Sequence, residues 1–518
     1  MKIFRKIGVE SSVLRASAPP SMTGRTALVY QLRTYWTGDL PCRYVQLPQI
    51  RLEPILKRRA LELNPKGIYY GHEVDRVDEY YGDVVVRFHE RGKVELPAAQ
   101  SVNATYVLGA DGGRMLTEQL GINMDVVTAH IRSPISQHRP DPSIFLHWFI
   151  RPELGGSLKT GYLYHIGPYH GEPYPLDPAT EEWVFACARL PHEQVHPFDE
   201  TDMLRRLHQT LQIPDLEVEL MSMSHWHVNA KVAECFRCQG GRIFLVGDAA
   251  HCVPPWGALG LDSEIQDADN LIWKLALALE RPNESGERLL DSYDTERRPI
   301  GERVAKTSLY NMQAHALVLD QAIGLSPDKS ESDNISAMDQ GTPKRQEVTR
   351  ALKTLDVEFY AHGAEVGWFY EFDYETDYSR SGSTPRHPQL KENGEMELCE
   401  YRPSTKPGSQ LPHAWLRRSV TKRSTRELVE MDRMVVIGMS PSWESIRHPL
   451  IQVMIIDGDE EDHAGWNEVC GRLAGRGALL VRPDNIIAYR FPDDKILSQP
   501  ESLEEVAHIV KRVLRLEA

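Results

Sequence analysis

Two turns in the chain place a glycine and an aspartate directly after an apolar run, "YVLGADGG" at 106–113 and "FLVGDAAH" at 244–251. Glycine lets a ligand approach the main chain closely. A helix that begins at such a turn presents unpaired N–H groups and the positive end of its dipole. The carboxylate of Asp111 or Asp248 could accept hydrogen bonds from ligand hydroxyl groups. The pattern indicates a site for a hydroxylated anionic ligand, and a simple N-cap role for Asp248 is the alternative.

The composition narrows the kind of partner. The 518 residues carry a net charge of −15, which argues against a nucleic-acid surface because phosphate binding needs clustered Lys and Arg. No apolar run approaches the ~18–20 residues that span a bilayer. The seven cysteines are dispersed, which favours reduced thiols and a cytoplasmic location. Cys235 and Cys238 form one C-x-x-C without two further zinc ligands at suitable spacing, so we predict no metal site.

Hydrophobic periodicity predicts the elements that position the two turns. Residues 44–63 indicate a loop that enters an amphipathic helix, with a helical period from Leu52 to Leu63, and alternation at 84–88 indicates a β-hairpin or meander. Aromatic, β-rich runs separated by Pro and Gly over 125–225 are typical of an antiparallel sheet. An apolar helix follows at 271–280, and short strands with a final amphipathic helix begin near 430. This order of elements indicates an α/β chain that is interrupted by a β-sheet insert.

Several long segments carry a resemblance to one enzyme family. "GRIFLVGDAAHCVPPWGALGLDSEIQDADNLIWKLALAL" and "YVLGADGGRMLTEQLGI" resemble the GD and DG fingerprints of the single-component FAD-dependent aromatic hydroxylases, the p-hydroxybenzoate and phenol hydroxylase group. "LPQIRLEPILKRRA" resembles the family segment whose glutamine contacts flavin. "LCEYRPSTKPGSQLPHAWL" and "GALLVRPDNIIAYR" resemble the C-terminal region of the phenol and chlorophenol monooxygenase branch.

The resemblance implies a fold with several domains. It is an α/β fold with an FAD-binding Rossmann-like domain, an inserted β-sheet substrate domain and a C-terminal thioredoxin-like domain. The family usually begins with a strand and GxGxxG; this unit is not found here, so an N-terminal βαβ unit is expected to be missing. The implied domains are the discontinuous FAD-binding domain at 1–124 and 225–320, the substrate domain at 125–224, a helical and loop region at 321–429 and the thioredoxin-like domain at 430–518.

The resemblance also implies roles for individual residues. Asp248 would bind the ribityl chain, while Gly260 and Leu261 would offer N–H groups to the flavin. Gln49 would touch the flavin, and Arg114 would lie near the visiting NAD(P)H, with a solvated surface role as the alternative for both. The implied cofactor-binding set is Gln49, Asp111, Arg114, Gly247, Asp248, Ala249, Pro255, Gly260 and Leu261.

The implied activity is hydroxylation of a phenol by FAD, NAD(P)H and O2 through a flavin C4a-hydroperoxide. No catalytic base can be named. His147, Tyr162, Tyr164 and His165 are candidates for facing the substrate, and ordinary sheet positions are the alternative for each. A homodimer supported by the C-terminal domain stays open.

The sequence departs from the family inside the GD fingerprint. Asp262 stands where Asn is common, and Glu264 stands where a small residue is common. Two carboxylates beside a flavin that becomes anionic should oppose its reduction unless they are protonated or point away. Three interpretations follow: a monooxygenase with an incomplete N-terminus, a chain that binds FAD poorly and acts as a non-catalytic binding protein, or another flavoenzyme of the same fold.

Overall fold

The computed structural model describes most of the chain. The described residues are 2–18, 26–28, 30–31, 45–80, 82–92, 100–112, 124–138, 144–169, 177–189, 196–281, 286–325, 333, 345–372, 386–418, 421–456, 477–491 and 502–515. Within these residues, no helix has both the length and the apolar content needed to cross a membrane.

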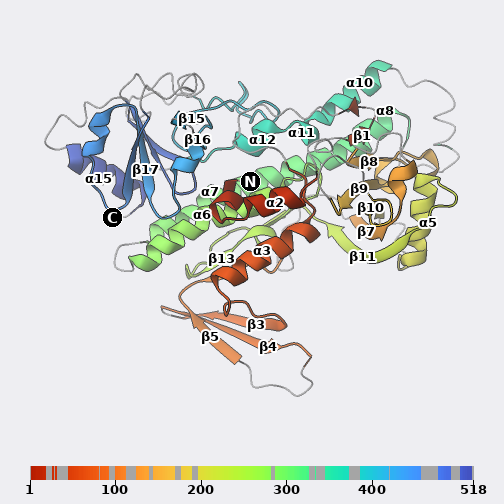
Figure 1. The fold of residues 1–518 in the computed structure, drawn as a ribbon, viewed down its shortest axis with the longest axis horizontal. Helices are drawn as coiled ribbons and strands as arrows, with labels where there is room; N and C mark the ends of the chain where they lie inside the picture. Colours follow the sequence, from red (N-terminus) through yellow and green to blue (C-terminus); the bar gives the residue numbers. More distant parts are fainter. Residues whose placement is uncertain are drawn as a thin grey trace.

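Two long helices form the axis of the molecule. Helix α6 (Gly260–Glu280) and helix α7 (Glu287–Gln313) pack against each other and run between the C-terminal sheet and the seven-stranded sheet (Figure 1). The buried face of α6 includes Leu271 and Leu275, which pack in one cluster with Phe244. The apolar face predicted from the sequence is therefore the face that α6 buries.

Two short parallel strands lie against these helices. Strand β6 (Val107–Gly109) pairs with β13 (Ile243–Leu245). A separate antiparallel meander contains β3 (His72–Glu79), β4 (Val84–Glu90) and β5 (Gln100–Ala104). The predicted meander is thus present. A further pair joins β12 (Lys231–Val232) to β14 (His251–Cys252).

The largest sheet has the strand order β11-β7-β10-β9-β8-β1-β2. Its members are β1 (Thr26–Leu28), β2 (Tyr30–Gln31), β7 (Met124–Arg132), β8 (Leu146–Trp148), β9 (Tyr162–Gly167), β10 (Glu182–Arg189) and β11 (Glu219–Val228). Strands β7 to β11 pair antiparallel, as the aromatic alternation predicts, whereas β1 joins β8 in parallel. The sheet therefore recruits a segment from far upstream in the sequence.

The two faces of this sheet pack against different helices. One face buries Leu163 and Phe185 together with Met203 and Leu207 of α5 (Glu200–Leu211). The other face packs against the end of α7 and the helices that follow it. These are the π-helix η6 (Ala314–Leu319), α8 (Asp320–Ala322), α10 (Arg345–Thr354) and α11 (Asp356–Phe359), and α12 (His362–Val366) follows them in the chain. Helix α4 (Ser157–Thr160) connects β8 to β9.

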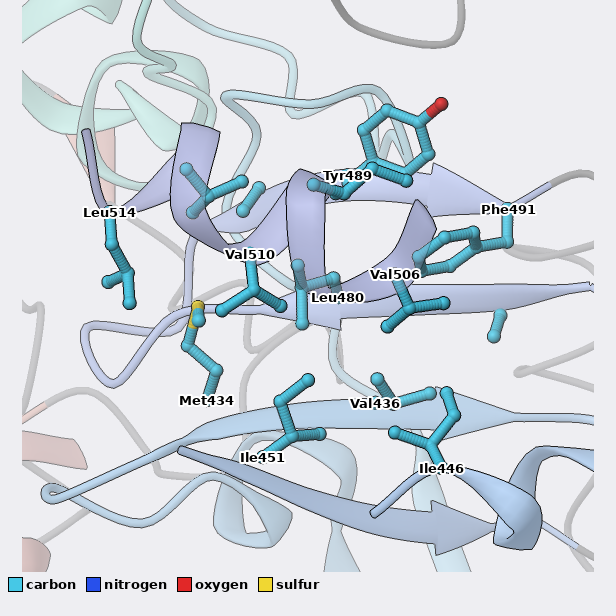
Figure 2. Close-up of a cluster of buried hydrophobic side chains, with 14 of the residues drawn as sticks. Met434, Val436, Ile446, Ile451, Leu480, Tyr489, Phe491, Val506, Val510 and Leu514 are labelled. Carbon is cyan, nitrogen blue, oxygen red and sulfur yellow. The ribbon is translucent and has the colours of Figure 1, made fainter. Parts of the chain in front are cut away.

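The C-terminal unit is a four-stranded sheet with the order β18-β17-β19-β20. The strands are β17 (Met434–Gly438), β18 (Ile451–Ile455), β19 (Ala478–Val481) and β20 (Ile487–Phe491), preceded by the hairpin of β15 (Trp415–Arg418) and β16 (Thr421–Ser424). Figure 2 shows Val506 and Val510 of α15 (Ser502–Val513), and Leu514 directly after this helix, directed at side chains of the sheet such as Leu480. The parallel β17–β18 pair, the antiparallel strands and the covering helix agree with the predicted thioredoxin-like fold.

The N-terminal helices cover the start of α6. Helices α1 (Lys2–Lys6), α2 (Glu10–Ala16) and α3 (Gln49–Leu63) share an apolar cluster with Ile265. The start of α6 is therefore held between the α1–α3 group and α7.

Candidate active site

The DG and GD turns lie side by side at one edge of the β6–β13 pair. Val107 pairs with Ile243 in parallel, and the N–H of Val246 donates to the carbonyl of Gly109 at 3.0 Å. Parallel strands place their carboxyl ends at the same edge, where ligands of open α/β sheets bind. Asp111 and Asp248 follow these two ends, and both side chains are exposed.

Gly247 holds the GD turn in a conformation that favours glycine. It is buried with φ of +64°, a region that residues with a Cβ rarely adopt. A Cβ at this position would come within 3.3 Å of the Cγ of Glu264. Its N–H donates to Oδ2 of Asp267 at 3.2 Å, which anchors the turn to α6.

A network of buried charged side chains anchors the turn to α6 and α7. Nε2 of His251 lies 2.8 Å from Oδ2 of Asp267, and Nε of Arg297 donates to Oδ1 of Asp267 at 2.7 Å. All three side chains are fully buried. Burial alone would raise the pKa of Asp267, but the positive charge of Arg297 and the His251 contact hold it below its usual range. The carboxylate therefore stays ionised, with hydrogen bonds to both oxygens.

The start of α6 is open to solvent beside this turn. Its N-cap residue, Leu259, makes no side-chain hydrogen bond to the helix. Leu261 is 43% exposed, and Pro255 is also exposed. The free N–H groups of the first turn therefore remain available to an acceptor.

Asp248 and Glu264 lie close together at this turn, and Asp262 lies in the first turn of α6, where it interacts with Glu365. Burial raises the pKa of Glu264 to about 7, and the negative charge of Asp248 adds to the effect. Burial also raises the pKa values of Asp248 and Asp262, although solvent reaches both side chains.

Comparison with known proteins identifies the type of site. Residues 1–308 match a family model described as "FAD binding domain", and residues 404–512 match one described as "Aromatic-ring hydroxylase, C-terminal".

The chain belongs to this FAD-binding family.

Its relatives include the 2,4-dichlorophenol 6-monooxygenase of Delftia acidovorans, 28% identical over 99% of this chain and 90% of the relative. Another is the phenol 2-monooxygenase of Pseudomonas sp. (strain EST1001), 25% identical over 97% of this chain and 83% of the relative. The flavin-dependent monooxygenase PieE, solved in complex with FAD and substrate, has a TM-score of 0.83 at 24% identity and covers 100% of this chain and 91% of its own. The predictions of an FAD cofactor and of a flavin-dependent aromatic monooxygenase are confirmed at the level of the family.

The residues around the GD turn fit FAD. Gly112 offers bare main chain beside the GD turn, and no atom of the described residues lies within 4 Å of where its Cβ would stand. The start of α6 offers N–H donors to negative charge, and Asp248 offers an acceptor to hydroxyl groups. The carboxyl groups of Asp262 and Glu264 oppose an anionic ligand only when ionised, and their raised pKa values favour the neutral form.

The structure gives less information on two of the predicted cofactor-binding residues, Arg114 and Gln49. Arg114 lies outside the described residues. Gln49 is exposed at the start of α3, and its side-chain amide donates to Glu53 at 2.6 Å. Helix α3 packs near the start of α6 through the cluster that contains Ile265. The flavin contact of Gln49 stays a prediction.

Sequence reasoning missed a second buried network that joins α6 and α7 to the C-terminal sheet. Lys274 donates to Glu296 at 2.8 Å, and Arg482 donates to both oxygens of Glu296 at 2.7 Å. Burial lowers the pKa of Lys274 to about 8, against the opposing charge of Glu296. The one sequence signal was a lysine inside the apolar run "LIWKLALAL".

Tyr370 and Asn270 connect the two networks. The hydroxyl of Tyr370 accepts from Arg297 at 3.4 Å and from Asn270 at 3.2 Å, while Asn270 also donates to Glu296 at 2.8 Å. A continuous set of hydrogen bonds thus extends from the GD turn to Arg482.

The aromatic sheet residues divide between its two faces. Tyr162 and Tyr164 lie on the face that packs toward the end of α7, and the ring of Trp148 is 5.7 Å from that of Tyr162. Burial raises the pKa of Tyr164 to about 12 and that of Tyr162 further. His147 and His165 point to the opposite face, since they pair with Leu163 and Trp183 of that core.

Proposed function

We propose that this chain is an FAD-dependent monooxygenase that hydroxylates a phenolic ring with NAD(P)H and O2. The observation that carries the proposal is the GD turn beside the open start of α6. Gly247 is held there by Asp267, which is in turn fixed by His251 and Arg297. The turn does not begin an α-helix, since a 3-10 turn and strand β14 follow it, so its anchoring in the core and its exposed Asp248 are suited to binding a ligand.

The proposed cofactor contacts are centred on that turn. Asp248 would accept hydrogen bonds from the ribityl hydroxyls, and Gly260 and Leu261 would donate main-chain N–H groups to the flavin ring. The remaining proposed contacts come from Gln49, Asp111, Arg114, Gly247, Ala249 and Pro255. When bound, FAD supplies hydride acceptance from NAD(P)H and oxygen activation, chemistry that side chains lack.

The chain's own residues position the aromatic ring and keep water away. Trp148, Tyr162 and Tyr164 present ring faces from β8 and β9 toward the helices. Ala186 of the neighbouring strand β10 lies in the same cluster and takes little space. Aromatic rings favour offset or edge contacts with one another, so this face suits a flat aromatic substrate.

Optical spectroscopy with turnover assays tests the proposal. The purified protein with added FAD should show a flavin spectrum that saturates near one FAD per chain. Phenol or 2,4-dichlorophenol should stimulate NAD(P)H consumption and give a hydroxylated product. NAD(P)H consumption that yields hydrogen peroxide but no hydroxylated phenol would instead support an oxidase or reductase.

A non-catalytic binding protein is the second candidate, and one observation favours it. The side chain of Glu264 lies against Gly247 and Gly260, with its Oε1 3.6 Å from where a Cβ of Gly260 would stand. This carboxyl group can occupy space and carry negative charge where the cofactor is expected. A Glu264→Gly variant that binds FAD tightly while the wild-type chain does not would favour this candidate.

We also propose that the chain works in the cytoplasm. The five cysteines of the described residues are all free thiols. A reducing compartment keeps thiols in this state. Fractionation of the source cells with an antibody to the chain tests the location.

A further inference from the structure

A stripe of buried polar side chains runs along one face of α7 and its π-helical extension. Ser308, Asn311 and His315 are spaced i, i+3 and i+7, which places them on one helix face. All three are fully buried. The extension η6 carries His315, and π-helical turns of this kind are frequent at functional sites.

Several polar atoms of this stripe lack hydrogen-bond partners among the described residues. They are Oγ of Ser308, both side-chain amide atoms of Asn311 and Nδ1 of His315. Buried polar groups without partners cost free energy, so native proteins seldom retain them without a role. Two such atoms on one amide indicate a position that both donates and accepts a hydrogen bond.

The loop after the GD turn meets the stripe. Trp256 is buried, and its Nε1 also lacks a partner among the described residues. The amide nitrogen of Asn311 is 2.7 Å from where a Cβ of Gly257 would stand, so Asn311 lies against this loop. Trp256 and Trp148 belong to the same cluster as Met312 of α7. The unpartnered atoms therefore belong to two elements that lie against each other, with the aromatic sheet face packed in the same cluster.

The same face of α7 continues toward the cofactor turn. Arg297 and Gly301 precede Ser308 on this face, at helical spacings of four and seven residues. Arg297 belongs to the network under the GD turn, and Gly301 lies against His251. One helix face thus connects the cofactor turn to the stripe.

We propose that Ser308, Asn311 and Trp256 bind the oxygen substituents of a neutral aromatic substrate that carries a carbonyl group as well as a hydroxyl group. The donor N–H groups of Trp256 and Asn311 suit a carbonyl oxygen, and the amide oxygen of Asn311 suits a hydroxyl proton. Neutral donors and acceptors match such oxygens rather than a carboxylate. The inference rests on the proposed function and assigns the part of that site that selects the substrate.

A matched pair of probes tests the assignment. 3-Hydroxyacetophenone carries a hydroxyl and a carbonyl oxygen that cannot bond to each other, and 3-ethylphenol has nearly the same shape without the carbonyl oxygen. Dissociation constants come from the change in bound-flavin absorbance or, without FAD, from tryptophan fluorescence quenching. Wild-type protein should bind 3-hydroxyacetophenone at least about tenfold more tightly than 3-ethylphenol, the ratio expected for hydrogen bonds to otherwise unpaired buried groups.

Three variants separate recognition from folding. Asn311→Leu, close in shape to Asn, should reduce the preference to about twofold or less, and Ser308→Ala should reduce it partially. Tyr310→Phe alters a residue that is 46% exposed on the same helix and should leave the preference unchanged. Thermal midpoints and FAD stoichiometry are measured for each variant. Ser308→Ala provides the test if Asn311→Leu fails to fold.

The outcomes distinguish this inference from the proposed function. The inference is overturned if the wild-type chain binds neither probe or binds both equally. It is also overturned if the preference is unchanged in Asn311→Leu and Ser308→Ala, a result that would indicate that these atoms bind an internal water. Hydroxylated product together with an unchanged preference in these variants leaves the proposed function standing. Selective binding that depends on Asn311 without any hydroxylated product supports the inference and contradicts the function.

Discussion

Replacement of Glu264 by Gln should stabilise the protein at pH 8 and not at pH 4. Burial, followed by the charges of Asp248 and Asp267, raises the pKa of the Glu264 carboxyl from 4.5 to about 7 in the folded chain. Between these values the unfolded chain has lost the proton and the folded chain has kept it. Stability therefore falls as the pH rises through this window, and the penalty is complete above about pH 7.

The magnitude follows from the size of the pKa difference. At about 1.4 kcal/mol per pH unit, ionisation of Glu264 costs the folded state about 2–3 kcal/mol once partial solvent screening is allowed for. Glutamine keeps the shape and removes the charge. Glu264→Gln should therefore match the wild type near pH 4 and exceed its stability by about 2–3 kcal/mol at pH 8.

Urea unfolding at pH 4, 5, 6, 7 and 8 without FAD measures the difference. Glu280→Gln is the matched control because Glu280 is exposed at the far end of the same helix. Its effect should be small at every pH. A stability difference for Glu264→Gln that is independent of pH, or a variant less stable than the wild type at pH 8, would refute the reasoning.

Other predictions concern the two buried networks and the turn itself. Arg297→Met should destabilise the chain by about 3–5 kcal/mol, because it leaves the buried carboxylate of Asp267 unpaired; a loss below 1 kcal/mol in urea unfolding contradicts this. Arg482→Met should cost a similar amount and weaken FAD binding through Tyr370, and unchanged FAD affinity would show that the C-terminal unit does not support the turn. Asp248→Ala should lower FAD affinity about tenfold with an unchanged thermal midpoint in the absence of FAD, whereas a lower midpoint with normal affinity would reveal a purely structural role for this side chain.

The sequence was informative where the structure depends on local patterns. The hairpin or meander around Val84–Phe88 and the antiparallel aromatic strands follow from turn residues and hydrophobic periodicity. The helix expected directly after Gly247 was wrong, because a single 3-10 turn (Gly247–Ala249) and strand β14 follow there and α6 begins only at Gly260. The parallel pairing of β1 with β8 could not be predicted, because it joins segments separated by more than one hundred residues. Local propensity carries no information about such a pairing.

The candidate site could be predicted only in part, because some of its contacts are local in sequence and others are distant. The GD turn is a local feature and was readable, but the partners that anchor it are distant in sequence. Arg297 of α7 donates to Asp267 of α6, and Arg482 of the C-terminal unit donates to Glu296 of α7. The helical spacing of Ser308, Asn311 and His315 can be seen in the sequence. Without tertiary contacts, however, polar residues on one helix face predict a solvent-exposed surface rather than a buried one.

Equilibrium titration of the purified chain with FAD tests the central claim most directly. We expect the flavin absorbance to shift on binding and to saturate near one FAD per chain, and we expect Asp248→Ala to weaken this binding and Glu264→Gly to strengthen it. A wild-type chain that stays folded and colourless after FAD is added and unbound FAD removed, with no gain in Glu264→Gly, would contradict the assignment of the GD turn as the cofactor site.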